Sequence, residues 1–303
     1  MAGLHGQQER DPVVVLISTG IRPEEKMLIE AFRRRGVALH AVDDREVHGP
    51  LSAWPQNVPH AEVVLARSKS HWRNVTLARW MEAHGARVVN PSRVLETCGD
   101  KAATTLALIG EGVPSLSASV AFSRDAGLEA GRQLGYPVVV KPVVGSWGRL
   151  IGKANDCDAL ELALEHKEAV GGSPHAATYL QPFVETGGMD IRAFVIGGRC
   201  VAAIERHSSH WRTNTALGAR AVGRLVDEDL AAVAEAAAAA VSGALVAVDL
   251  FETPHGLLVN EVNGTMEFRN SVDTTGVDIP GIVADHVLEM ASVDRGLGLP
   301  RVS

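Results

Sequence analysis

Two acidic residues and an amide lie close together near the C-terminus. Asp249 interrupts the apolar run VAVDLFE, and Glu261 and Asn263 lie in VNEVN. Residues two apart on a strand point to the same face, so Glu261 and Asn263 share one. A loop from Thr253 to Leu257 would place Asp249 opposite Glu261 in a hairpin. These hard oxygen ligands suit Mg²⁺ bound together with substrate phosphates; the alternative is a solvated hairpin with a polar outer face.

A lysine ends a second apolar run, at Lys141 in VVVKPVVGSWGR. A lysine at the end of a buried strand needs a charge partner, which phosphate oxygens would provide. Gly145 and Gly148 let the backbone approach phosphates closely, and Arg149 adds charge. The P-loop pattern GxxxxGK[ST] is absent, so an ordinary β-turn after Lys-Pro is the competing interpretation.

Three further cations could bind anions. Lys101 lies in the first turn of a predicted helix, where a lysine opposes the helix dipole; a nearby anion would explain it, and so would a solvated side chain. Arg192 in MDIRAF and Arg206 in AIERH could hold phosphate or acyl-phosphate oxygens, or could be half-exposed sheet arginines. His207 and His210 are three residues apart, but SSHWRTN is typical of a loop, so metal binding there is disfavoured.

The elements that must position these residues alternate between strands and helices. In the first part of the chain, the pattern predicts a small parallel sheet, with strands at 13–18, 37–41, 62–66 and 87–89 and helices at 23–35 and 71–84. Further helices are predicted at 101–109 (with Asp100 as N-cap), 123–134, 158–170, 227–241 and 279–291. Further strands are predicted at 137–141, 150–153, 178–184, 190–196, 200–205, 245–252 and 257–263. No GxGxxG follows the first strand, which argues against a dinucleotide site.

The composition is that of an ordinary globular chain. It is 46% hydrophobic and 21% charged, and its length of 303 residues predicts two or three packed units. The formal net charge of −7 argues against nonspecific nucleic-acid binding. The three cysteines form no CxxC, which argues against a disulfide framework or a zinc ribbon. No apolar signal region or membrane span is evident, so a cytoplasmic location is expected.

The order of these segments resembles the ATP-grasp ligases of the RimK and LysX families. The matching strings are DK, VVVKPVVGSWGR, YLQPFVE, DIRAF, WRTNTA, VAVDLFE and VNEVNGTMEFRNSV. The similarity is strongest to the LysX branch, which carries KPVVGSWGR, WxTNTA, and NEVNxTMEFxNS followed by TGVDIPG. It also covers RSKSHWRNVTLARW, so it extends over nearly the whole chain.

The resemblance implies a mixed α/β (α+β) ATP-grasp fold of three domains. A Rossmann-like pre-ATP-grasp α/β domain would occupy residues 1–98. Two α+β subdomains, residues 99–178 and 179–303, would hold ATP between them.

The resemblance also implies roles for individual residues. Lys101 and Lys141 would contact the ATP phosphates, and Asp249, Glu261 and Asn263 would hold Mg²⁺, with Mn²⁺ as an alternative. The turn closing over the phosphates would comprise Gly145, Ser146, Trp147, Gly148 and Arg149. The strand beside adenine would comprise Gln181, Pro182, Phe183 and Val184, with Glu185 facing the ribose hydroxyls. The catalytic candidates that would face the acyl phosphate and substrate are Arg192, Asn214 and, on charge grounds, Arg206.

Ligases of the LysX branch act on a small acidic amino-group carrier protein, LysW. Its C-terminal glutamate is the carboxylate substrate, and the amine is an α-amino acid, typically 2-aminoadipate or glutamate. The resemblance therefore implies amide formation through an acyl phosphate, by a homodimer or homotetramer without nucleic-acid or membrane partners. The alternatives are a RimK-like glutamate ligase acting on a protein tail or small molecule, and a non-catalytic nucleotide-binding scaffold.

Three positions depart from the family pattern and predict a changed amine pocket. They are Leu217 and Ala219, where TARGG is expected, and Gly264, where a larger residue is usual.

A basic stretch in the N-terminal part could bind the acidic carrier, or could be a solvated helix edge. It comprises Arg67, Lys69, His71, Arg73 and Arg79.

Overall fold

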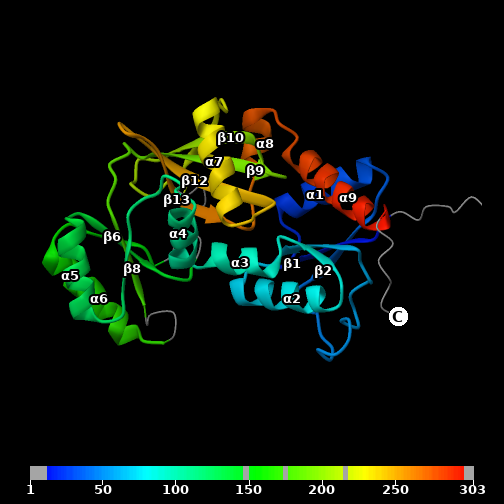
Figure 1. Cartoon of the computed structure of the whole chain (residues 1–303), viewed down its shortest axis with the longest axis horizontal. Helices are drawn as coiled ribbons and strands as arrows, with labels where there is room; N and C mark the ends of the chain where they lie inside the picture. The colour runs from blue at the N-terminus through cyan, green and yellow to red at the C-terminus, as the bar shows by residue number, and fades with distance from the viewer. Residues whose placement is uncertain (1–11, 146–149, 173–176, 214–217, 297–303) are drawn as a thin grey trace, which may run out of the picture. The chain divides into compact units, whose positions relative to one another are not determined.

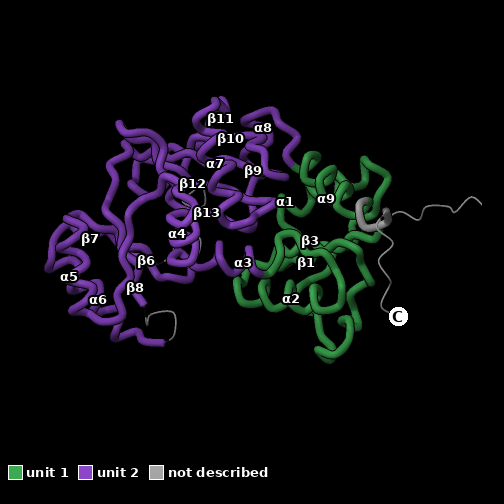
Figure 2. The backbone as a smooth tube through the Cα atoms, viewed as in Figure 1, with its two compact units in different colours: residues 1–92, 280–303 green, residues 93–279 purple. Residues whose placement is uncertain are grey.

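The structure, a computed structural model, describes residues 12–145, 150–172, 177–213 and 218–296. It divides into two compact units, residues 1–92 with 280–303 and residues 93–279 (Figure 2). Residues 280–303 therefore belong to the same unit as residues 1–92. The predicted domains, with boundaries after residues 98 and 178, placed them in the C-terminal subdomain. That three-part division stays a prediction.

The first unit is built on a parallel sheet of order β2-β1-β3-β4, of which Figure 1 labels β1 and β2. Its strands are β1 (Val14–Ser18), β2 (Leu39–Asp43), β3 (Val63–Arg67) and β4 (Arg87–Val89), and its helices are α1 (Pro23–Arg34), α2 (His71–Ala83) and, from residue 280 on, α9 (Ile279–Gly296). β1 and β3 are buried along their whole length, which is typical of parallel strands that are covered on both faces. The parallel sheet that was predicted for this region is confirmed.

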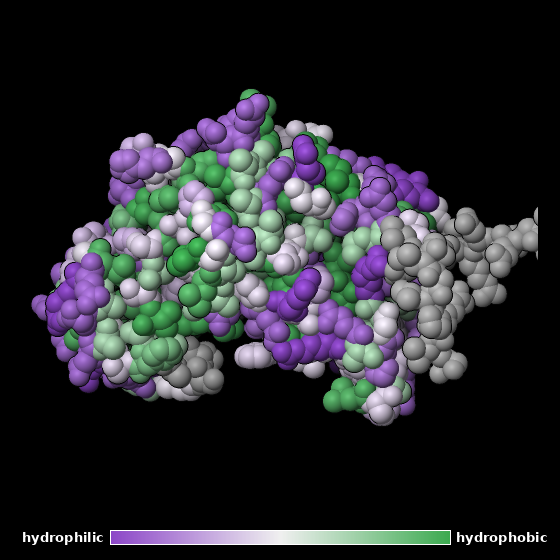
Figure 3. All heavy atoms as spheres, in the orientation of Figure 1, coloured by the Kyte–Doolittle hydropathy of each residue, from purple (hydrophilic) through white to green (hydrophobic). Residues whose placement is uncertain are grey.

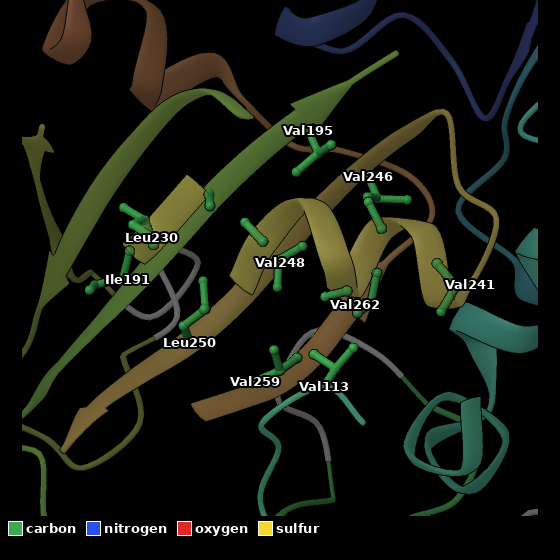
Figure 4. Close-up of a cluster of buried hydrophobic side chains, with 14 of the residues drawn as sticks. Val113, Ile191, Val195, Leu230, Val241, Val246, Val248, Leu250, Val259 and Val262 are labelled. Atoms are coloured by element: carbon green, nitrogen blue, oxygen red, sulfur yellow. The ribbon is translucent and has the colours of Figure 1, made fainter. Parts of the chain in front are cut away.

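The second unit contains an antiparallel sheet of order β11-β10-β9-β12-β13. Its strands are β9 (Met189–Ile196), β10 (Arg199–His207), β11 (Arg220–Arg224), β12 (Leu245–Thr253) and β13 (Gly256–Asn263). One face packs against α4 (Lys101–Gly110) and α7 (Glu228–Ala240). Figure 4 shows the resulting apolar cluster, which includes Val248 and Leu250 of β12 and Leu230 of α7. Since strand residues alternate between faces, Asp249 belongs to the opposite face.

A second sheet in the same unit has the order β5-β8-β6-β7. Its strands are β5 (Ser119–Ala121), β6 (Val138–Pro142), β7 (Gly152–Ala154) and β8 (Thr178–Pro182), and it packs on α5 (Arg124–Leu134) and α6 (Cys157–Val170). Val138, Leu160 and Leu180 lie at the centre of this small core. The sheet positions Lys141 near the end of β6.

Four elements were not predicted: β5, β11, α3 (Ser92–Gly99) and α8 (Arg269–Thr275). The N-cap residue of α8 is Phe268, which makes no side-chain capping hydrogen bond, so the usual start signal is missing. β11 is an edge strand with an arginine at each end and Gly223 within it, a sequence with weak alternation. Most other boundaries differ from the prediction by one or two residues.

No helix within the described ranges is long and apolar enough to cross a membrane. On the face drawn in Figure 3, hydrophilic and hydrophobic residues are interspersed.

Candidate functional site

Asp249 of β12 and Glu261 of β13 lie directly opposite each other in the hairpin. Cross-strand partners share a face, so both carboxylates are on the side away from the apolar cluster. Asn263 joins them, because its Nδ2 atom donates to Asp249 Oδ2 at 3.4 Å. Asp249 is buried, whereas 27% of the Glu261 side chain is exposed. The predicted juxtaposition of the three residues is confirmed, although the loop length that predicted it is not.

A β-bulge produces this register. The hairpin turn is tighter than predicted, since Thr253 already pairs with Gly256. Continued without interruption, that register would place Asp249 opposite Asn260. The pairing shifts between Asp249 and Leu250, so that Asn260 becomes an extra residue and Glu261 faces Asp249.

Two arginines hold Asp249. Arg192, opposite it on β9, donates from Nε to Oδ1 at 2.7 Å and from Nη2 to Oδ2 at 2.8 Å. Nη2 of Arg206 lies 3.2 Å from Oδ2. Burial alone would raise the pKa of Asp249, but the charges and hydrogen bonds of the two arginines lower it to about 2. Asp249 is therefore ionised at neutral pH.

Arg206 is a buried link between two carboxylates. Only 3% of its side chain is exposed, and Nε donates to Asp190 Oδ1 at 2.6 Å while Nη2 contacts Oδ2 of the same residue. Thr213 donates to Asp190 Oδ2 at 2.6 Å. Burial raises the pKa of Asp190 against the opposing effect of Arg206. The guanidinium faces protein carboxylates, which is a poor arrangement for contacting substrate.

Sequence reasoning missed Asp190 and Thr213. A signal was available for Asp190, since it lies two residues before Arg192 and therefore shares its face. Asp190 also pairs directly with Arg206 across β9 and β10, and opposite charges are favourable at such a cross-strand position.

Lys141 is a buried cation whose ammonium group contacts two amide oxygens. Nζ donates to Gln181 Oε1 at 2.6 Å and to Asn260 Oδ1 at 3.1 Å. Burial lowers the pKa of Lys141 to about 8, although nearby Glu261 acts in the opposite direction. The second amide contact, from Asn260, was not predicted.

The side chain of Gln181 accepts a hydrogen bond from Lys141, and its place beside adenine stays a prediction. Its Nε2 donates to the Tyr179 hydroxyl at 3.1 Å, and that hydroxyl shares a 2.7 Å hydrogen bond with Thr105 of α4. Burial raises the pKa of Tyr179. A hydrogen-bonded chain thus runs from α4 to the phosphate-binding candidate Lys141.

Lys101 lies at the start of α4, beside both Gly145 and Glu261. Asp100 caps the helix as predicted, its carboxylate accepting from Ala103 N at 2.9 Å. Lys101 Nζ donates to the Gly145 carbonyl at 2.7 Å and lies 3.4 Å from Glu261 Oε1. The remaining turn residues, Ser146, Trp147, Gly148 and Arg149, lie outside the described residues.

The segment after β8 is organised around an aromatic ring. Phe183 N donates to the Pro137 carbonyl at 2.9 Å. Lys153 Nζ lies 3.6 Å from the centroid of the Phe183 ring, and Trp211 meets that ring edge-on at 6.1 Å. Sequence reasoning did not select Lys153 or Trp211. Pro182 and Val184, which were predicted to lie beside adenine, are half-buried. Glu185, which was predicted to face the ribose, is exposed.

The donor set on this face fits Mg²⁺ by its chemistry. It offers two carboxylates and an amide oxygen, the hard ligands that Mg²⁺ prefers. Within the described residues, Oδ1 of Asp249 accepts a hydrogen bond from Arg192 alone, which leaves it a second lone pair. In the described part of the chain, this face included, no group of three His, Cys, Asp or Glu side chains could hold a metal ion, so the third ligand here would be the amide of Asn263. His207 contacts Glu205 at 2.9 Å.

Packing explains Gly264. A Cβ atom there would lie 3.3 Å from Cys98 Cβ and 3.5 Å from Leu95 Cδ2, so α3 leaves little room for a larger side chain. Burial, with a contribution from Glu261, raises the pKa of Cys98 to about 12, consistent with an inert packed thiol. Gly264 therefore matches α3 and need not reflect the amine pocket. Ala219 is half-buried, while Asn214 and Leu217 lie outside the described residues.

The basic stretch of the first unit is only partly available for docking. The prediction is wrong for Arg67, because 8% of its side chain is exposed and Nε donates to buried Glu25 at 2.8 Å. Arg73 pairs with Asp44 at 2.8 Å. Lys69 and Arg79 are exposed.

The chain matches two protein families along its length. Residues 13–97 match the LysX preATP-grasp domain, and residues 100–287 match the RimK-like ATP-grasp domain.

Known relatives agree with this assignment. The chain is 32% identical to the alpha-aminoadipate–LysW ligase LysX of Sulfolobus acidocaldarius, over 89% of this chain and 99% of the relative. It is 31% identical to the glutamate–LysW ligase ArgX of Sulfurisphaera tokodaii, over 91% and 98%. A solved RimK-domain ATP-grasp protein from Sphaerobacter thermophilus superposes with a TM-score of 0.78 at 27% identity, over 91% of this chain and 99% of that one. The chain therefore belongs to the family of RimK-like ATP-grasp ligases, enzymes that join a carboxylate to an amine at the expense of ATP, and carries the LysX type of preATP-grasp domain.

Proposed function

We propose that this ligase joins the C-terminal glutamate of a small acidic, LysW-like carrier protein to the α-amino group of an amino acid. One observation carries the proposal: two buried lysines approach the face where Asp249, Glu261 and Asn263 lie together. Relatives named as LysW ligases supply the substrate class, because they match the chain over nearly its whole length.

In this proposal, Lys101 and Lys141 bind the ATP phosphates. Asp249, Glu261 and Asn263 hold Mg²⁺, with Mn²⁺ as an alternative, and the bound ion would neutralise charge that develops on the transferred phosphoryl group. The turn Gly145–Arg149 covers the phosphates, the segment Gln181–Val184 lies beside adenine, and Glu185 faces the ribose.

A carboxylate oxygen of the carrier attacks the γ-phosphorus, and ADP leaves. The amine nitrogen then attacks the acyl carbon, the amide forms, and inorganic phosphate leaves with the oxygen that came from the carboxylate. We assign Arg192 to the acyl-phosphate oxygens, because within the described residues its Nε and Nη2 atoms bind Asp249 and its Nη1 atom is left to donate to a substrate oxygen. Asn214 would face the substrate. We assign Arg206 and Asp190 to positioning, since both are buried and paired with each other.

Intact-mass spectrometry of the carrier tests the proposal. Purified chain is incubated with ATP, Mg²⁺, an acidic carrier ending in glutamate, and a mixture of amino acids. The carrier should gain the mass of one amino acid minus water, with one ADP released for each amide. A carrier lacking its last glutamate is the matched control and should stay unmodified.

Two outcomes favour the competing functions. A carrier of unchanged mass, with ADP release and glutamate added to another protein tail or small molecule, would indicate a RimK-like glutamate ligase. Nucleotide binding without ADP release under any of these conditions would indicate a scaffold. The scaffold is the weaker alternative, because Lys141, Asp249, Glu261 and Asn263 are all present.

A further inference from the structure

The ammonium group of Lys141 is held by neutral partners. Gln181 Oε1 and Asn260 Oδ1 accept its hydrogen bonds at 2.6 and 3.1 Å. A buried lysine is normally paired with a carboxylate, which satisfies its hydrogen bonds and cancels its charge. Amide oxygens satisfy the hydrogen bonds without cancelling the charge. The positive charge of Lys141 therefore remains available to an anionic ligand.

The bulge in β13 is what supplies the second amide. Leu250 pairs with Val259 and Asp249 pairs with Glu261, so Asn260 has no partner of its own on β12. An uninterrupted ladder from the turn would put Asn260 opposite Asp249 and would move Glu261 out of that position. With the bulge, two consecutive residues contact two different lysines: Asn260 accepts a hydrogen bond from Lys141, and Glu261 lies 3.4 Å from Lys101.

The amide of Gln181 is held in place by a hydrogen bond on the side away from Lys141. Gln181 Nε2 donates to the hydroxyl of Tyr179, which is itself hydrogen-bonded to Thr105. This arrangement directs Oε1 toward Lys141. Asn260 approaches Lys141 from a different sheet, since Lys141 and Gln181 lie on the paired strands β6 and β8 whereas Asn260 belongs to β13. Asn260 thus ties the lysine of one sheet to the acidic strand of the other.

We propose that Asn260 is a positioning residue that holds the Lys141 ammonium beside the acidic strand while leaving its charge for the nucleotide phosphates. The inference rests on the proposed function, which assigns Lys141 to those phosphates. It predicts that a carboxylate at position 260 is harmful to nucleotide binding although it would make a stronger partner for the lysine.

The test is Asn260→Asp, which changes charge but hardly changes shape. ADP affinity is measured by calorimetry at pH 7 in EDTA, so that the new carboxylate cannot act through a metal ion. We expect Kd to rise about 10- to 100-fold, the equivalent of losing one charge-assisted hydrogen bond. The melting temperature should stay the same or rise, because the buried ammonium gains an ionic partner. A merely structural asparagine predicts that affinity and melting temperature fall together.

Three further variants make the result decisive. Asn155→Asp adds the same charge at an exposed position of the same unit and should leave Kd unchanged. Asn260→Ala should weaken binding with some loss of stability, since one hydrogen bond to Lys141 is removed. Lys141→Met should weaken ADP binding. If it does so while Asn260→Asp binds ADP like the wild type, the role of Asn260 is refuted alone. If Lys141→Met also binds normally, the phosphate assignment of the proposed function is refuted.

Discussion

Arg192 on β9 lies directly opposite Asp249 on β12, and its guanidinium binds both carboxylate oxygens at 2.7 and 2.8 Å. With Arg206 also close, the pKa of Asp249 falls to about 2 despite burial. A carboxyl whose pKa is lowered on folding contributes stability above its unfolded value, and that contribution is lost as the pH falls toward 2. The proposed metal ligand is thus also a structural anion, and its variants must be judged on both counts.

Replacing either proposed metal-binding acid should abolish ligation. Asp249→Asn and Glu261→Gln remove charge from the site that would hold Mg²⁺, and we expect kcat to fall by at least about 100-fold. Steady-state ADP release at saturating Mg²⁺ measures the effect. Glu252→Gln is the control, because Glu252 lies on the same strand but its carboxylate is bound to Arg224. Near-normal turnover of either variant would remove that residue from the metal site.

Nucleotide affinity and protein stability should respond to alkaline pH in opposite directions because of Lys141. Its pKa is about 8 in the folded chain against an ordinary 10.5. The penalty of burying the ammonium is fully present below about pH 8 and is relieved as the pH rises toward 10.5, so stability rises in this window. The full difference is on the order of 3 kcal/mol. ADP binding should weaken over the same range as the lysine loses its charge.

The matched variant for this effect is Lys141→Met. It should bind ADP weakly at every pH and, at pH 7, should unfold at a higher urea concentration than the wild type. The unfolding free energy and the ADP affinity of both proteins are measured against pH, and the difference between the two proteins isolates the contribution of Lys141. If the difference in unfolding free energy is the same at pH 7 and pH 10, the lysine does not titrate in this range.

The two arginines beside Asp249 should behave differently. Arg206→Met breaks a buried ion pair and leaves Asp190 without its main partner, which should cost about 3 to 5 kcal/mol of unfolding free energy. Arg192→Lys keeps a charge near Asp249 but loses the paired hydrogen bonds, so we expect a folded protein with reduced kcat. Urea unfolding and single-turnover kinetics separate the effects. A stable Arg206→Met enzyme with a purely kinetic defect would contradict the positioning role.

Exposed basic residues of the first unit should govern the association with an acidic carrier. Lys69→Glu combined with Arg79→Glu should raise the KM for the carrier and leave the KM for ATP unchanged, because complementary charge mainly accelerates association. The defect should shrink as salt screens the wild-type attraction. Lys26→Glu with Arg34→Glu, on α1, is the control for net charge. Equal carrier kinetics in the two double variants would show that Lys69 and Arg79 do not form the docking surface.

Local patterns were sufficient for part of the fold and part of the candidate site. Short-range rules predict the apolar strand β1, the Asp100 cap of α4 and the shared face of Glu261 and Asn263. The bulge at Asn260 was not predictable in this way. It depends on the competition between a tight turn at Pro254-His255 and the requirement that Glu261 face Asp249.

Partners from distant segments were the main omission. Arg67 is basic in sequence but pairs with Glu25, which lies 42 residues earlier in the chain. Asn260 reaches Lys141 across 119 residues, and Arg206 reaches Asp190 on the neighbouring strand. A charged residue considered alone suggests a ligand, whereas the fold decides whether a protein carboxylate already occupies that position.

The most direct test of the central claim follows the oxygen atoms of the carrier. A carrier whose C-terminal glutamate carboxylate bears ¹⁸O is ligated with unlabelled ATP, and the inorganic phosphate is analysed by ³¹P NMR. Activation as an acyl phosphate predicts that one ¹⁸O enters inorganic phosphate for each amide formed. It also predicts that the nucleotide product is ADP. Amide formation with unlabelled phosphate, or with the label in AMP, would contradict an acyl-phosphate mechanism.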